Sequence, residues 1–157
     1  MRIDIKKFKR IKKEAIELYK SANNIHCPYF GEDISFNSKG LEHLEFKARG
    51  RARSIHDQFF RFKLLKFAVQ IIKKSHTLQE FQEAKKLEAV KTNTRREEKM
   101  VLVRYYGFVA ILDDYRMKVI IKEVVGGAKH FWSVIPFWKK GKRDNKKILH
   151  LGDLECD

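Results

Sequence analysis

Four side chains in this sequence are of types that could transfer a proton or hold a phosphate. His43 follows a glycine-led helix start, Arg53 and Arg61 come shortly after it, and Ser133 lies in a late aromatic run. Histidine titrates near neutral pH, arginine offers phosphate a planar fork of donors, and a serine hydroxyl can donate a hydrogen bond to phosphate. We take His43, Arg53, Arg61 and Ser133 as catalytic candidates, with His43 as the proton-transfer group. Each also fits an ordinary structural role, as a helix histidine, a surface cation or a strand residue.

A basic loop follows His43 directly. Lys47, Arg49, Arg51 and Arg53 occur with no acid among them and with Gly50 between, which predicts an exposed loop. Lys47, Arg49 and Arg51 are therefore candidates for binding an anionic polymer.

Three later residues complete the predicted binding set, namely Lys122, His130 and Trp132. In a regular strand, His130 shares a face with Trp132, and Ser133 points to the opposite face. His130 and Ser133 can therefore line one pocket only if that strand bulges or twists. Trp132 is also a natural core residue, which competes with a role as a platform for a base.

Together these residue types match the requirements of RNA cleavage without a metal. RNA carries its own nucleophile, the 2′-OH, so an enzyme needs a proton acceptor, a proton donor and cations that stabilise the charged phosphorane. Aromatic rings can hold an unstacked base. The sequence contains no glycine-rich nucleotide loop, HExxH or nucleophile elbow, and His26-Cys27 is an isolated pair of potential ligands. We therefore expect no cofactor and no metal.

Charge points to the same class of partner. The chain has 157 residues, enough for one domain with a hydrophobic core, and a formal net charge of +15. Such a charge favours nucleic acid, an anionic membrane surface or an acidic protein as the partner. No segment approaches the ~18 apolar residues of a membrane span, and no signal-peptide core is present, so a cytoplasmic location is expected.

Residues 100–138 contain three β-rich runs separated by Asp113-Asp114 and Gly126-Gly127, which predicts a three-stranded meander. The first run is apolar on both faces, as in a central strand. The second run alternates between an apolar face and a row of cations, Arg116, Lys118 and Lys122, that suits a polyanion.

Helical patterns precede the meander. Apolar spacing predicts helices over residues 3–22, 41–47, 55–74 and 78–90, the third opened by a Ser54 N-cap and the fourth by a Thr77/Glu80 capping box. The first helix carries a strongly basic face, which fits either a solvated surface or a contact with nucleic acid or a membrane. Residues 91–99 form a polar link, and 34–36 and 148–151 are possible short strands.

Helices followed by antiparallel strands indicate an α+β fold, with three or four helices packed on a four- or five-stranded antiparallel sheet. We expect a single domain over residues 1–157. It divides into a basic amphipathic helix at 1–22, a core at 27–138 and a charged extension at 139–157.

Short motifs in this core resemble a known family. Residues 36–40, FNSKG, with His43, the arginine-rich loop, and residues 130–136, HFWSVIP, are similar to phage-type nucleases of the barnase–EndoU–colicin–RelE superfamily of small ribonucleases. The likeness spans most of 27–138. It implies an antiparallel sheet against N-terminal helices, with an RNA site on the open sheet face that uses a helix histidine and a polar residue from a late strand. Several members of that superfamily are toxins neutralised by a partner protein.

We therefore predict a metal-independent endoribonuclease, a toxin-like effector that cleaves RNA by 2′-OH attack to a 2′,3′-cyclic phosphate. Its partners would be RNA, either tRNA or mRNA, and an acidic antitoxin or immunity protein. The alternative is a non-catalytic module that binds RNA or DNA through the same basic surface.

Overall fold

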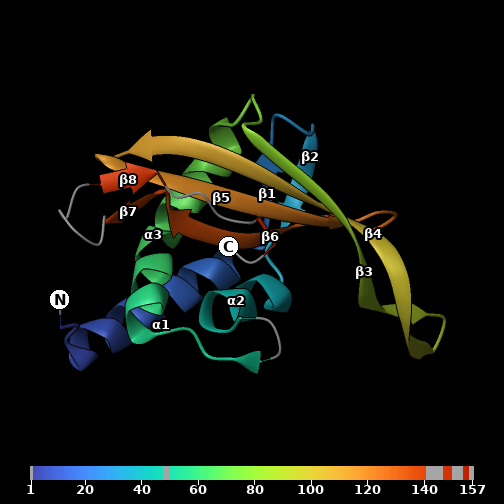
Figure 1. Ribbon diagram of the computed structural model, residues 1–157, viewed down its shortest axis with the longest axis horizontal. Coiled ribbons are helices and arrows are strands. Elements are labelled where there is room, and N and C mark those ends of the chain that lie inside the picture. The colour runs from blue at the N-terminus through green and yellow to red at the C-terminus, as the bar shows by residue number, and fades with distance from the viewer. Residues whose placement is uncertain (1, 48–49, 141–146, 150–153, 156–157) are drawn as a thin grey trace.

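Eleven helices and strands follow one another in the computed structural model, which describes residues 2–47, 50–140, 147–149 and 154–155 (Figure 1). The helices are α1 Ile5–Ala22, α2 Ser38–Glu45 and α3 Ile55–Lys74. The strands are β1 Asn24–Cys27, β2 Glu32–Ser35, β3 Glu80–Thr92, β4 Arg95–Leu112, β5 Tyr115–Val124, β6 Lys129–Pro136, β7 Trp138–Lys140 and β8 Lys147–Leu149. The predicted α+β class is confirmed.

The main sheet has six strands in the order β1-β2-β6-β5-β4-β3, so the predicted count of four or five was too low. All neighbours are antiparallel except β2 and β6, which pair in parallel at Ser35 and His130. The predicted meander is present as β4, β5 and β6. Asp113 and Asp114 both have positive φ, 47° and 63°, as the tight turn between β4 and β5 requires.

Two strands raise the count above the predicted one, namely β1, which pairs with β2, and β3, which pairs with β4. The connector before α2 folds into the β1–β2 hairpin rather than one short strand. The predicted 148–151 strand corresponds in part to β8, which pairs with β7 in a separate two-stranded sheet, and residues 150–151 lie outside the described residues.

The predicted helix over 78–90 was wrong, because this segment is strand β3. It pairs with β4 from Glu80–Gly107 to Thr92–Arg95, and the polar link at 91–99 is the end of this hairpin. Its Glu, Gln, Lys and Ala residues favour a helix, but β4 needs a partner along its edge, and tertiary pairing overrides the weak local preference. Burial alternates along β3, as in a strand with one covered face.

Helices α1 and α3 begin at the caps that their sequences encode. Asp4 accepts a hydrogen bond from the Lys6 N–H, and Ser54 Oγ accepts one from the Asp57 N–H at 3.1 Å. Helix α3 is buried around much of its circumference, as its pattern predicts. Helix α2 begins at Ser38, three residues earlier than expected, because Asn37 caps it through a bond from the Gly40 N–H.

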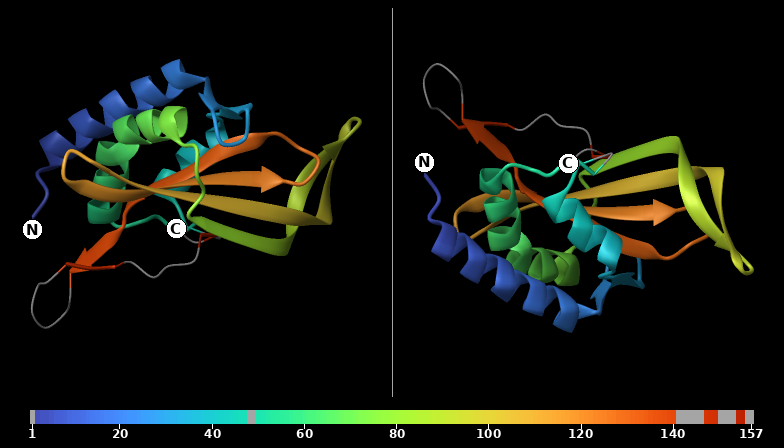
Figure 2. Two further views of the ribbon diagram at one scale, coloured as in Figure 1. Left: turned by 90° about the horizontal axis from the view of Figure 1, so that it is seen from above. Right: turned by 90° about the horizontal axis from the view of Figure 1, so that it is seen from below.

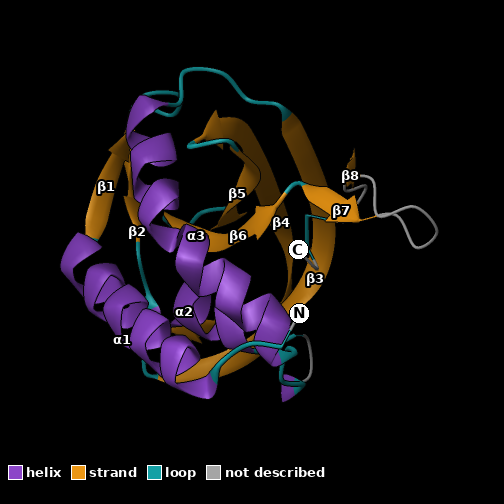
Figure 3. Cartoon of the chain, turned by 90° about the vertical axis from the view of Figure 1, so that its left-hand side faces the viewer, coloured by secondary structure: helices purple, strands orange, loops and turns teal. Residues whose placement is uncertain are grey.

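The helices gather on one side of the sheet, as Figures 2 and 3 show. Residues of α1, α3 and the sheet form the main core, where Tyr19, Phe36 and Phe131 are in aromatic contact. Helix α1 thus packs on the core through its apolar face and leaves most of its basic face exposed. A second, smaller core of Val103, Tyr105, Ile120 and Leu154 lies on the other sheet face.

Candidate functional site

A β-bulge in β6 places His130 and Ser133 on the same sheet face. His130 pairs with Lys122 and Phe131 with Ile121, but Ser133 pairs with Ile120, so Trp132 is an extra residue between two regular pairs. The bulge shifts the alternation by one position. The bulge that His130 and Ser133 need in order to line one pocket is therefore present.

Helix α2 approaches this strand so closely that only glycine fits at one position. A Cβ on Gly40 would lie 2.2 Å from the Phe131 carbonyl oxygen and 2.6 Å from the Tyr19 hydroxyl. One turn later, the His43 ring stacks on Trp132 with a centroid distance of 4.0 Å. Gly40 therefore sets the distance from which α2 presents His43.

One hydrogen-bonded network joins all four predicted catalytic residues. Arg53 Nη2 lies 3.1 Å from His43 Nε2, and Arg53 Nε donates to the His43 carbonyl oxygen at 2.8 Å. Asp57 accepts from Arg53 Nη1 at 3.2 Å and from Arg61 Nε at 2.8 Å. Arg61 Nη1 donates in turn to Ser133 Oγ at 2.5 Å. The structure thus connects residues from α2, a loop, α3 and β6.

The partners of the network define its charge state. A guanidinium can only donate, so His43 Nε2 must accept, and the imidazole is neutral with its proton on Nδ1. Burial by itself would raise the pKa of Asp57, but the charges and hydrogen bonds of Arg61 and Arg53 outweigh burial and hold that pKa below its ordinary value. The network therefore contains two cations, one carboxylate and one neutral imidazole.

His130 lies in a second cluster, beside Trp132. Burial, reinforced by the positive charges of Lys122 and Lys39, lowers the pKa of His130 to about 4. Its Nε2 is buried and has no hydrogen-bond partner among the described residues. A neutral imidazole with an unpartnered nitrogen is a hydrogen-bond acceptor that the fold itself leaves unused.

The predicted basic row on β5 is not an open surface. Lys118 Nζ lies 2.9 Å from Glu80 and Lys122 Nζ lies 2.7 Å from Glu88, and both lysines are buried. Burial lowers the pKa of Lys122 despite the opposing effect of Glu88. β3 supplies both carboxylates, so the segment predicted as a helix neutralises the two lysines of this row, whereas Arg116 packs on Phe137.

Trp132 supports His43 rather than presenting a free ring. His43 covers one face at 4.0 Å, and Lys122 Nζ lies 4.4 Å from a ring centroid of the same indole. The indole is thus in contact with both His43 and Lys122. A role of Trp132 as a platform for a base remains a prediction.

The predicted basic loop is only partly described. Lys47 and Arg51 are exposed, and the Lys47 N–H donates to the Arg51 carbonyl oxygen at 2.6 Å. Phe46 and Ala52 form a β-bridge at the base of the loop, next to Arg53. Arg49 lies outside the described residues. RNA binding by Lys47, Arg49 and Arg51 remains a prediction.

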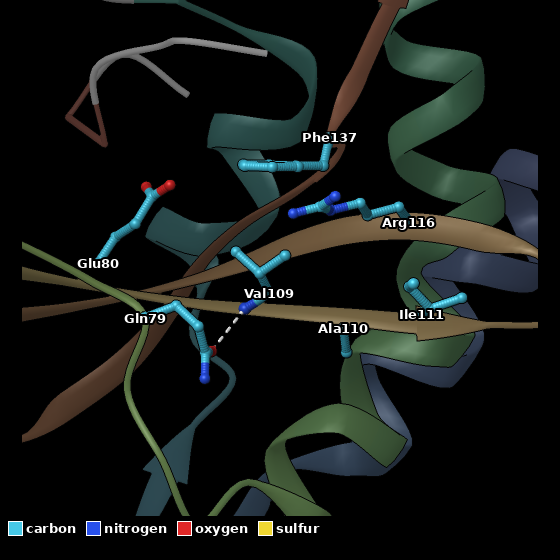
Figure 4. Close-up of a pocket in the computed structure, with 7 residues that line it drawn as sticks. All are labelled: Gln79, Glu80, Val109, Ala110, Ile111, Arg116 and Phe137. Carbon is cyan, nitrogen blue, oxygen red and sulfur yellow. Dashed lines mark hydrogen bonds between the residues drawn. The ribbon is translucent and has the colours of Figure 1, made fainter. Parts of the chain in front are cut away.

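A hollow of about 600 Å³ lies near the other end of this sheet face (Figure 4). Arg116 and Phe137 line it, with the guanidinium carbon 4.6 Å from the ring centroid. The Val109 N–H donates to Gln79 across its floor at 2.9 Å. Of the cations predicted to suit a polyanion, Arg116 lines this hollow, but no residue of the hydrogen-bonded network does, so the hollow is not the centre of the network.

Sequence reasoning missed several residues of this face. Asp57 is not among the sequence-predicted site residues, although its position four residues from both Arg53 and Arg61 is a usable signal. The even-numbered residues of β3 also face the site. Their two-residue alternation indicates a strand, but the segment was predicted to be a helix. These residues are Glu80, Gln82, Lys86 and Glu88.

Comparison with protein-family models, with curated proteins and with solved structures finds no match. In the part of the chain that the structure describes, no helix is long and apolar enough to cross a membrane. Nor do any three His, Cys, Asp or Glu side chains gather there in a way that could hold a metal ion.

Proposed function

We propose that this protein is an endoribonuclease of the kind that uses the 2′-OH of RNA as its nucleophile. One observation carries the proposal. His43, Arg53, Arg61 and Ser133 were selected separately for their chemistry, and they form one connected network with Asp57. A toxin-like role, an acidic neutralising protein and a cytoplasmic location extend this proposal.

The two arginines would bind the scissile phosphate. Each arginine lies four residues from Asp57 in the chain and pairs with its carboxylate, which fixes two forks of donors on one acid. Preorganised donors stabilise the charge that develops on a phosphorane without having to reorganise. Ser133 Oγ, already bonded to Arg61, would add a neutral donor to the same phosphate.

The histidines would handle the protons. A bound phosphate would attract the Arg53 guanidinium and break its hydrogen bond to His43 Nε2. His43 could then accept the 2′-OH proton. His130 is the second candidate, because its Nε2 is unpartnered among the described residues and its ring is neutral near pH 7.

A non-catalytic binding module remains the second candidate, and the distribution of exposure favours it. The histidines and both network arginines are buried, whereas Lys47, Arg51 and the cations along the outer face of α1 are exposed. Exposed cations suffice to bind a nucleic acid backbone without any chemistry.

The test is incubation of the purified full chain with total RNA in excess EDTA, followed by analysis of fragment ends. We expect fragments that end in a 2′,3′-cyclic phosphate. His43→Gln should lower the cleavage rate by about 10²–10⁴-fold, the scale for loss of a general acid–base group. His56→Gln is the matched control, because His56 is an exposed histidine whose ring contacts Phe60 at a tilt of 60°, outside the network.

Three outcomes decide between the candidates. A His43→Gln protein that cleaves at the wild-type rate assigns proton transfer elsewhere, and His130→Gln then tests the second histidine. Full activity in both variants contradicts a histidine mechanism. Salt-sensitive RNA binding without any cleavage establishes the binding module.

A further inference from the structure

The proposed RNA site is closed in this structure. His43, Arg53, Arg61, His130, Lys122 and Ser133 are each at most 7% exposed. A phosphate cannot reach the network unless part of the protein moves. Residues 154 and 155 lie on the sheet face that carries Trp132.

Leu154 packs into an apolar cluster on the sheet, which we call its seat. It is 4% exposed and packs with Val103, Tyr105 and Ile120, and Trp132 lies against the same cluster. Its N–H donates to Gln82 Oε1 at 3.0 Å. Gly107 makes room for it, since a Cβ there would lie 3.2 Å from Leu154 Cδ2.

The next residue occupies two donors of the site. The Trp132 indole N–H donates to the Glu155 carbonyl oxygen at 3.3 Å. The Glu155 carboxylate pairs with Lys86, whose Nζ also lies 3.3 Å from the Tyr105 hydroxyl. The oxygens of Glu155 thus accept from the Lys86 ammonium group and from the Trp132 indole N–H. The oxygens of an RNA phosphate can accept from the same two donors.

We propose that residues 154–155 shield the site and compete with RNA for it. This inference rests on the proposed function, since it concerns regulation of the same face. RNA would bind once Leu154 leaves its seat, because Lys86 and the indole N–H are then released. If Leu154 occupies its seat about nine-tenths of the time, only about one-tenth of the protein can bind RNA, and the apparent affinity for RNA is lowered about tenfold.

The experiment uses the full chain with Leu154→Ser, a neutral change that weakens the seat, and with Glu155→Gln, which removes the charge pair while keeping the shape. Leu87→Ser and Glu17→Gln are the matched controls, because Leu87 is 64% exposed on β3 and Glu17 is exposed on α1. Hydrogen exchange of the Trp132 indole N–H reports the opening. RNA affinity and cleavage in EDTA report the consequence.

We expect faster indole exchange and RNA binding up to about tenfold tighter in both site variants, with no change in the controls. If the Leu154→Ser chain does not fold, Glu155→Gln, which changes one side-chain atom, decides alone. Faster exchange with unchanged RNA affinity overturns the shielding, as does a pair of variants unchanged in both measurements.

The two proposals fail separately. If wild type and variants cleave RNA equally, the ribonuclease stands and the shield is wrong. If the site variants bind RNA more tightly but no protein cleaves it, the shield stands and the ribonuclease is wrong.

Discussion

Asp57 is the residue that holds the candidate network together. It is the common partner of Arg53 and Arg61, and the charge of these arginines keeps it ionised. Two guanidiniums this close would otherwise repel each other. The carboxylate therefore permits both phosphate-binding candidates to occupy one site.

His130 should make the protein sensitive to acid. The unfolded chain binds a proton at the ordinary pKa of 6.5, whereas the folded chain binds it at about 4, because burial disfavours the charged ring. Between these values the unfolded state holds more protons, so stability falls as pH decreases from 6.5 to about 4 and is fully retained above 6.5. The contribution is about 3 kcal/mol.

Chemical denaturation at several pH values measures this effect. His130→Gln should flatten the stability profile in that pH window, whereas the exposed control His56→Gln should leave it unchanged. Equal slopes for wild type and His130→Gln would show that the buried ring does not titrate there.

At the scale of elements, β3 does more than close the sheet edge. Its alternate side chains pair with Lys118 and Lys122, and Lys86 holds Glu155. The same strand thus neutralises the cations of β5 and anchors the shielding segment.

The contact between α2 and β6 gives an element-scale prediction. Helix propensity alone would make Gly40→Ala stabilising by about 1 kcal/mol. The new Cβ would lie 2.2 Å from the Phe131 backbone oxygen, and backbone cannot give way as a flexible side chain can. We expect the steric clash to outweigh helix propensity and to lower the free energy of unfolding by about 3 kcal/mol, the upper range for overpacking.

Thermal or chemical unfolding checks this sign. Glu42→Ala, at an exposed position of the same helix, is the control and should change stability by less than about 0.5 kcal/mol. A Gly40→Ala protein as stable as wild type would mean that α2 can move away from β6, and that Gly40 does not set the position of His43.

At the scale of the whole molecule, the net charge of +15 should govern the association with RNA. Exposed cations occur on the 47–51 loop and on α1, on different elements of the fold. Because bound phosphates release counterions, affinity should fall steeply as salt rises.

The slope of that dependence locates the RNA footprint. Replacing Lys47, Arg49 and Arg51 by Glu should lower the slope by about 2, since each contact to a single strand contributes about 0.7. Replacing Lys6, Lys9 and Lys13 by Glu changes the charge of α1 by the same amount and should lower the slope less. Equal effects of the two triple variants would indicate a diffuse field rather than a footprint on the loop.

Local sequence patterns were enough to predict the features that depend on neighbouring residues. The α3 pattern with its Ser54 cap and the meander with its Asp113-Asp114 turn appear in the structure as expected, because periodicity and turn chemistry are properties of neighbouring residues. The four catalytic candidates could be selected for the same reason, since residue type fixes what each side chain can do.

Tertiary structure decided which of these residues meet. The bulge at Trp132, the pairing of β3 with β4 and the position of Asp57 between two arginines depend on partners distant in the chain. A one-residue shift in strand register moves a side chain to the other face of a sheet, and no local pattern specifies that shift. The covering of the site by Leu154 and Glu155 is of the same kind, because it requires a seat made by β3, β4, β5 and β6 together.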